Sequence, residues 1–389
     1  MEPDTNLPSD QDPPSHEISP QANDPFARPI LSPVAPPEVE SGIRRFFIGP
    51  QGLRAGWSVL IFIVLFVALF IAIGLVLRAI HAVEPTAGFT PRNVLFNELD
   101  QLVALLSTAW VMTLIERRRL LDYNLTGPRP ARHFFSGLAV GFIALSGLVA
   151  SLAAGGWLHF GGAALSGAAI LQYGLFWGCA FLIVGCVEEG TFRCYLQYTF
   201  TRGLNFWWAL GIVAFLCAIL LFTHKGNGAW GDYAIALLGL LPCYILHQKG
   251  AAHSAFWQAA WVTSTLFGFA HTTNGGENWV GIFSAAAIGF VFCVSIRVTG
   301  SAWWAIGAHA GWDWAETYFY GTADSGFVPK GHFLTTTPAG NALWSGGSDG
   351  PEGSILILGI LLLMLVWLVV VYGRRHNAQP APAAEFAPQ

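Results

Sequence analysis

Charged side chains are scarce in this chain of 389 residues, because Asp, Glu, Lys and Arg together make up only 11% of it. An average soluble domain contains about 25% charged residues. Aliphatic, aromatic and cysteine residues reach 54% of the chain, and the mean hydropathy is +0.52. Such a chain cannot cover its apolar surface in water, so the composition indicates an integral membrane protein.

Basic runs of the kind that bind nucleic acid are also absent, and the formal net charge is only −4. The sequence has no Cys-x-x-Cys pair, and the absence of His-Glu-x-x-His excludes the zinc site of soluble metalloproteases. The cysteines lie in apolar stretches and are predicted to be small buried helix residues rather than disulfides or metal ligands: Cys179, Cys186, Cys194, Cys217, Cys243 and Cys293.

Large apolar residues are sparse at both ends of the chain. Residues 1–42 are rich in Pro, Ser, Asp and Glu and are predicted to be a disordered cytoplasmic tail, because they cannot bury enough surface to fold. This segment is too acidic and too rich in proline for a signal peptide. Residues 43–377 are predicted to form one transmembrane helical domain, and residues 378–389 a short disordered tail.

Long apolar runs fill the middle of the chain. A bilayer span needs about 20 apolar residues. Residues 59–77 carry no charge, and residues 355–372 are nearly as clear. Pro242 makes the segment 232–247 the weakest of the others, which are 98–115, 133–154, 170–200, 206–223, 232–247, 253–271, 279–297 and 302–320. The sequence therefore predicts an all-α fold, a polytopic transmembrane helical bundle of about ten spans.

Arginine and lysine recur in alternate loops between these segments: Arg44, Arg45, Arg54, Arg117, Arg118, Arg119, Arg129, Arg132, Arg202, Lys249, Arg297, Arg374 and Arg375. Positive side chains in short loops mark the cytoplasmic side of a membrane. Both termini are therefore predicted to be cytoplasmic, and the expected location is a bacterial inner membrane.

Ionisable residues inside apolar segments are costly in a membrane, so they are candidates for function. Glu98 and Asp100 open the second span and are predicted to be interfacial. Glu189 lies four residues before Arg193, which is the favourable order for a helical ion pair. Glu188 is rotated by about 100° from Glu189 and is predicted to be unpaired. The alternative is that these charges only join helices through an ion-pair cluster.

Two histidines lie in later apolar segments. His271 follows Phe267 by four residues, and by itself it fits a structural role at the end of an apolar run. His309 lies four residues before Asp313, so the carboxylate can meet the imidazole and fix its tautomer. Glu188 and the two imidazoles could hold a water, or a metal-bound water, whose proton the carboxylate accepts. That chemistry hydrolyses amides.

The order of these residues resembles the CPBP family of intramembrane proteases, which includes CAAX prenyl endopeptidases and bacteriocin-processing proteins. The similarity extends over about residues 120–320. The motif E-E-x-x-x-R is similar to Glu188-Glu189…Arg193, F-x-x-x-H to Phe267…His271, and H-x-x-x-N/D to His309…Asp313. Two departures are a long gap after the first motif, with an apparent extra hairpin at 206–247, and Asp313 where many members have Asn.

The resemblance implies peptide hydrolysis near or within the bilayer, with a membrane-embedded or lipidated peptide or protein as substrate. The candidate catalytic residues are Glu188, Glu189, Arg193, His271, His309 and Asp313. Zinc or another divalent metal is the expected cofactor, and its candidate ligands are Glu188, His271 and His309.

Three other functions remain open from the sequence. A proton- or ion-coupled transporter could use the same buried Glu and His residues, although the chain lacks the repeated halves that many transporters have. A non-catalytic membrane scaffold is a further alternative. Serine chemistry has weak support from Gly346–Gly350, which matches G-x-S-x-G around Ser348 but lies in a glycine-rich loop.

Overall fold

The computed structural model describes residues 42–82, 88–223, 239–242, 245 and 254–373. The chain divides into two compact units, Met1–Arg45 and Phe46–Gln389. Helix α1 (Gly42–Phe47) begins in the first unit, and all other described elements belong to the second.

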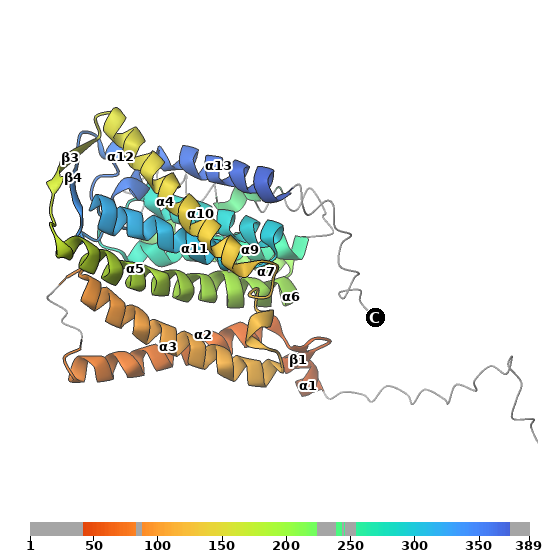
Figure 1. Ribbon diagram of the computed structural model, residues 1–389. Helices are drawn as coiled ribbons and strands as arrows, with labels where there is room; N and C mark the ends of the chain where they lie inside the picture. Colours follow the sequence, from red (N-terminus) through yellow and green to blue (C-terminus); the bar gives the residue numbers. More distant parts are fainter. Residues whose placement is uncertain (1–41, 83–87, 224–238, 243–244, 246–253, 374–389) are drawn as a thin grey trace, which may run out of the picture. The chain divides into compact units, whose positions relative to one another are not determined.

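The second unit is built from apolar helices (Figure 1). The principal ones are α2 (Ala55–Ala79), α3 (Pro91–Glu116), α4 (Pro130–Ala154), α5 (Ala168–Glu189), α7 (Phe206–Thr223), α9 (Ser254–Ala270), α10 (Trp279–Thr299), α11 (Trp303–Asp313) and α13 (Ile357–Leu368). In the described part of the chain, six helices are long and apolar enough to cross a membrane, with α5 and its continuation to Gly203 counted as one. These helices confirm the predicted all-α polytopic fold.

The remaining predicted spans are helical but shorter. Helix α9 has 17 residues, while α11 continues into the π-helical segment η5 (Trp314–Tyr320) and α13 into η7 (Val369–Gly373). The predicted segment 232–247 lies mostly outside the described residues. A helix therefore occupies every predicted span that the structure describes in full.

Short elements close the two ends of the bundle. Strand β3 (Leu158–Ala163) pairs antiparallel with β4 (Leu334–Pro338) at one end, and this two-stranded sheet of segments distant in the chain was not predicted from the sequence. The other short elements are β1 (Ile48–Gly49), β2 (Gly52–Leu53), η2 (Leu120–Asp122), η3 (Gly190–Leu196), α6 (Gln197–Gly203), η4 (His271–Thr273), α12 (Ala342–Ser345) and η6 (Pro351–Gly353).

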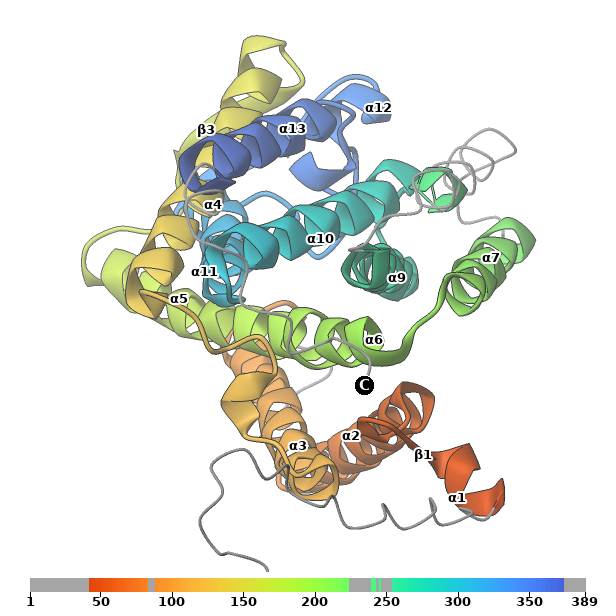
Figure 2. The same ribbon diagram turned by 90° about the vertical axis from the view of Figure 1, so that its right-hand side faces the viewer.

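Helix α5 passes through the centre of the second unit. It continues through η3 into α6, and this long helix has α2 and α3 on one side and α9, α10 and α11 on the other (Figure 2). The segment η3 is π-helical and begins directly after Glu189. Such π-helical turns are frequent at functional sites because they change which side chains share a helix face.

Helices α4 and α11 touch through their backbones. A Cβ added to Gly141 would lie 2.0 Å from the Ala308 carbonyl oxygen, and one added to Gly311 would lie 2.2 Å from that of Leu138. Glycine is required at such close approaches between membrane helices. The buried side chains of Leu145 and other α4 residues join those of α10, α11 and α13 in one apolar core, which fixes the position of α11.

All five described cysteines are free, as predicted, while Cys243 lies outside the described residues. Cys194, Cys217 and Cys293 are buried, but Cys179 is exposed on α5, so the prediction of burial is wrong there. A cysteine behaves as a small apolar residue, so it is tolerated on an outer helix face where it contacts lipid instead of the protein interior.

Candidate active site

One pocket of about 210 Å³ brings the three sequence motifs together. Glu188 enters it from the end of α5, His309 from α11, and His271 from η4 at the end of α9. The helices thus bring together three residues that are spread over more than 120 positions of the chain.

Glu189 is fully buried and contacts two groups. Its Oε2 lies 3.2 Å from Arg193 Nε, so the ion pair predicted from the helical spacing is present. Its Oε1 lies 2.9 Å from His309 Nδ1, a contact that the sequence did not predict. The Arg193 guanidinium, also fully buried, lies over the Phe267 ring at 4.2 Å from its centroid. The carboxylate of Glu189 therefore joins the first motif to the third.

His309 faces carboxylates through both ring nitrogens. Because a carboxylate only accepts hydrogen bonds, Nδ1 donates to Glu189. Nε2 lies 3.6 Å from Glu188 Oε2 and 3.4 Å from Asp313 Oδ2, so the predicted His309–Asp313 contact is also present. The Glu188 side chain is 34% exposed and the Glu189 side chain 0%, which leaves Glu188 as the member of the pair that solvent can reach.

His271 is oriented by its own helix turn. Its Nδ1 lies 2.8 Å from the carbonyl oxygen of Phe267, which can only accept, so Nδ1 carries the hydrogen and Nε2 is left for the pocket. The Phe267 ring packs edge-on against His271 at 4.8 Å between centroids, and against His309 at 6.1 Å. Phe267 therefore separates the two imidazoles and packs on the Arg193 guanidinium as well.

Glu98 lines the same pocket, although the sequence predicted an interfacial role for it. Helix α3 begins at Pro91, so Glu98 lies about two turns inside the helix. Gln101 donates a hydrogen bond to its Oε1 at 2.9 Å, while Asp100 is buried. The sequence shows an acid near the start of an apolar run, but only the packing of α3 against α5 turns it toward Glu188.

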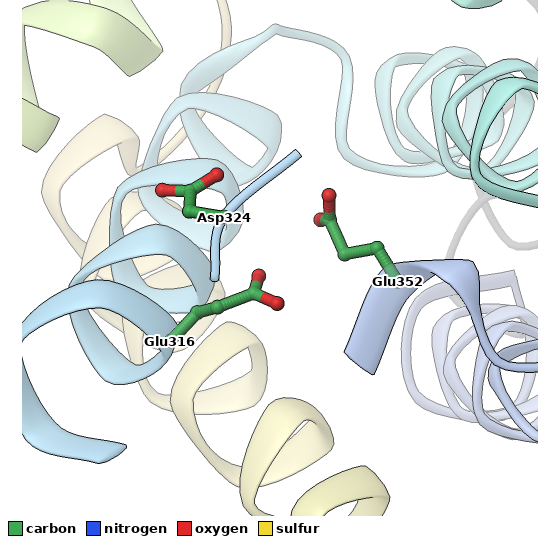
Figure 3. Close-up of side chains that lie close together, drawn as sticks. All are labelled: Glu316, Asp324 and Glu352. Carbon is green, nitrogen blue, oxygen red and sulfur yellow. The ribbon is translucent and has the colours of Figure 1, made fainter. Parts of the chain in front are cut away.

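A cluster of acidic residues lies at the same end of the bundle. Glu316, Asp324 and Glu352 each offer an oxygen atom, and these three atoms lie within 4.8 Å of one another (Figure 3). Asp324 and Glu352 also line the pocket. Glu316 falls seven residues after His309, close to two helical turns, which is a detectable signal. Asp324 lies in a turn and Glu352 in the short 3-10 helix η6, and neither segment shows such a periodicity in its sequence.

The predicted metal ligands do not form a comparable group. In the described chain, the donors that gather within 4.8 Å of one another are those of Glu316, Asp324 and Glu352, and not those of Glu188, His271 and His309. Tetrahedral zinc with bonds of about 2.1 Å requires ligand atoms roughly 3.5 Å apart. Both nitrogens of His309 already face carboxylates. The predicted zinc set therefore does not fit this arrangement.

Two further acids outside the helices have shifted pKa values. Burial, together with the charge of Glu352, raises the pKa of Asp349 to about 8. Burial and the neighbouring Asp349 raise the pKa of Glu277 to about 10. Asp349 accepts a hydrogen bond from the backbone N–H of Asn278 at 3.2 Å, which connects the loop before η6 to the start of α10.

Comparison with protein families agrees with the motifs. The family model described as Type II CAAX prenyl endopeptidase Rce1-like matches residues 170–255 and 245–315. These residues include all three motifs, from Glu188 to Asp313. The chain carries an Rce1-like domain. The family predicted from the motifs, that of CPBP and CAAX intramembrane proteases, is thereby confirmed. No curated protein and no solved structure matches the chain.

The geometry of the Rce1-like domain also bears on the alternatives. Glu188, His271 and His309 surround one pocket, as a hydrolytic site requires, whereas a transporter would distribute them along a path. The Ser348 hydroxyl is exposed and donates to the carbonyl of Gly276 at 3.1 Å, in a loop between α12 and η6. That loop lacks the strand–turn–helix geometry of a serine nucleophile.

Proposed function

We propose that the chain is an intramembrane endopeptidase that hydrolyses a peptide bond of a membrane-embedded or lipidated protein. The observation that supports it best is the convergence of Glu188, His271 and His309 on one pocket. All three residues belong to the part of the chain that matches the Rce1-like family model. A site with a carboxylate and two imidazoles contains the groups that peptide hydrolysis needs: a base for water and donors for the oxyanion.

In this proposal Glu188 is the general base. Its partial exposure allows a water to reach it, and its carboxylate accepts one proton as the water oxygen attacks the peptide carbonyl carbon. The carbonyl oxygen becomes an oxyanion, which the imidazolium forms of His271 and His309 stabilise through Nε2–H, since Nδ1 of each ring already donates to Phe267 or Glu189. The proton held by Glu188 then passes to the leaving amine as the C–N bond breaks. Water is consumed, and a carboxylic acid and an amine are released.

Glu189, Arg193 and Asp313 are positioning residues in this scheme. Glu189 fixes the His309 tautomer through the 2.9 Å contact to Nδ1, and Arg193 neutralises Glu189 from the other side. Asp313 lies 3.4 Å from His309 Nε2 and holds the ring toward the pocket. None of the steps requires a metal, in keeping with the poor fit of the predicted zinc ligands.

The experiment that tests the proposal compares membrane proteins from cells that produce wild type, Glu188→Gln, His309→Asn or a control, His159→Asn. His159 is an exposed histidine on β3, away from the motifs. Peptide termini generated by the wild type and the control should disappear in the two site variants. Because Gln keeps the shape of Glu but cannot accept the proton, we expect a loss on the order of 100-fold. Unchanged termini in Glu188→Gln would refute the proposal.

The arginines indicate which side of the membrane the pocket faces. One end of the described bundle carries eight of them: Arg54, Arg117, Arg118, Arg119, Arg129, Arg132, Arg202 and Arg297. The pocket end carries three basic residues, Arg78, Arg92 and Lys330. Along α3, the pocket residue Glu98 and Arg117 are 19 residues apart, or about 28 Å.

Positive residues mark the cytoplasmic side, so the pocket lies toward the opposite face in this proposal. The termini, predicted to be cytoplasmic, then lie on the arginine side. A substrate segment would accordingly enter the pocket from the outer half of the bilayer. A cysteine placed at the exposed Ser348, near the pocket end, should react with a membrane-impermeant thiol reagent in intact cells. Protection of that cysteine would reverse the orientation and leave the hydrolytic proposal untouched.

A further inference from the structure

The carboxylates of Glu316, Asp324 and Glu352 converge without a basic partner. Their closest oxygens lie within 4.8 Å of one another (Figure 3). None of the ion pairs between described residues includes any of the three. Carboxylates this close repel one another when ionised, so the cluster needs either shared protons or a bound cation.

Glu316 provides a second, independent observation. Its side chain is fully buried, and its Oε2 accepts a hydrogen bond from Trp312 Nε1 at 3.0 Å. Its Oε1 is buried and has no hydrogen-bond partner among the described residues. In Figure 3 the Glu316 carboxyl group points toward Asp324 and Glu352. An ion between the three groups would satisfy this oxygen, which is otherwise costly to bury.

Neighbouring donors already hold the carboxylates in place. Thr317 donates to Asp324 Oδ2 at 2.6 Å, and Ser325 donates to Glu352 Oε2 at 2.8 Å. Trp312 Nε1 also donates to Glu352 Oε1 at 2.8 Å. Hydrogen bonds that orient ligating carboxylates are typical of the outer partners of metal sites. The cluster is thus oriented before any ion binds, unlike a chance group of surface acids.

We propose that Glu316, Asp324 and Glu352 bind a hard divalent cation, with calcium preferred. The donor set consists only of oxygen, which suits calcium and magnesium rather than zinc or copper. Opposite ligands around calcium are about 5 Å apart, and around magnesium about 4 Å. The three oxygens lie within 4.8 Å of one another, which is close enough for one ion of the size of calcium to bridge them.

Such an ion would join three separate segments: η5, the turn that contains Asp324, and η6. It would also reduce the negative charge at the edge of the pocket, because Asp324 and Glu352 line it. Its ligands do not include Glu188 or His309, and its occupancy can be measured without any peptidase assay. Failure of the calcium proposal therefore leaves the hydrolytic proposal standing, and the reverse also holds.

The test measures thermal unfolding of the purified full-length chain in detergent, first stripped of metal and then titrated with CaCl₂. Extracellular calcium sites of moderate affinity have Kd values of about 0.1–1 mM, so we expect the unfolding temperature of wild type to rise over that range. Glu316→Gln should lose the rise. Glu277→Gln is the matched control, since it removes an acid outside the cluster and should keep the rise.

Terbium(III), a calcium substitute, supplies an independent readout. Trp312 donates directly to two of the ligands, so its excitation should sensitise terbium emission in wild type but not in Glu316→Gln. If Glu316→Gln does not fold, Glu352→Gln serves in its place. No calcium response in wild type, or the same response in Glu316→Gln, would overturn the site. An equal shift from NaCl at matched ionic strength would also overturn it, and an equal shift from MgCl₂ would refute the calcium preference.

Discussion

Replacing Glu189 by Gln should weaken the fold more than any change at its neighbour Glu188. The substitution removes the negative charge that lies 3.2 Å from Arg193 Nε and 2.9 Å from His309 Nδ1. Both side chains of the Glu189–Arg193 pair are fully buried, so water cannot replace the lost partner. The amide of Gln can still accept from His309, but it leaves the guanidinium as an isolated charge in the protein interior.

The size of the effect follows from this burial. Removing one partner of a buried ion pair typically costs about 3–5 kcal/mol. The Phe267 ring, 4.2 Å from the guanidinium carbon, still attracts the cation, and a desolvated contact of this kind contributes about 2 kcal/mol. Because this cation–π contact is present in both wild type and Glu189→Gln, it stabilises both and does not change the difference between their free energies of unfolding. We therefore expect Glu189→Gln to lower the free energy of unfolding by about 3 kcal/mol or more.

The double variant Glu189→Gln with Arg193→Met separates this cause from a general loss of packing. Met fills much of the volume of Arg without a charge, so the double variant should be more stable than Glu189→Gln alone. The assay is thermal and denaturant unfolding in detergent, followed by tryptophan fluorescence, with Glu188→Gln as the control that should unfold like wild type. Equal stability of Glu189→Gln and wild type, or a double variant less stable than the single one, would refute the reasoning.

Three other predictions concern the pH dependence of stability, the packing of α4 on α11, and the topology. The pKa of Asp349 is raised to about 8 in the folded chain, so between about pH 4 and 8 the unfolded chain binds fewer protons than the folded one. The free energy of unfolding should therefore fall as the pH rises through this range. Asp349→Asn should flatten that dependence when unfolding is measured across the range without calcium. Gly311→Ala should cost about 1–3 kcal/mol because its Cβ would meet the α4 backbone at 2.2 Å, whereas Gly147→Ala, with a nearest contact of 3.7 Å, should be neutral in the same unfolding assay. Reporter fusions at Gly346 and Ala378 should report opposite sides of the membrane, and one common side would contradict the topology.

The sequence by itself determined the features that depend on neighbours along the chain. A run of apolar residues specifies a helix in a bilayer because the helix is the conformation in which a single segment satisfies all of its own backbone hydrogen bonds. For this reason α2 and α10 lie where the hydropathy predicts them. The pairing of Glu189 with Arg193 follows in the same way from the spacing of side chains on one helix. The motif order was likewise sufficient to identify the family.

Tertiary structure alone decided which groups from different helices meet. The contact of Glu189 with His309 joins residues 120 positions apart, and Glu98 reaches the pocket only because α3 packs on α5. The cluster of Glu316, Asp324 and Glu352 brings together η5, a turn and the short helix η6, and no sequence periodicity predicts how these segments meet. Local spacing fixes the direction of a side chain relative to its own helix. The position of that helix, however, depends on contacts with other helices, such as the close contact of α4 and α11 at their glycines, and such a contact requires matching residues on both helices.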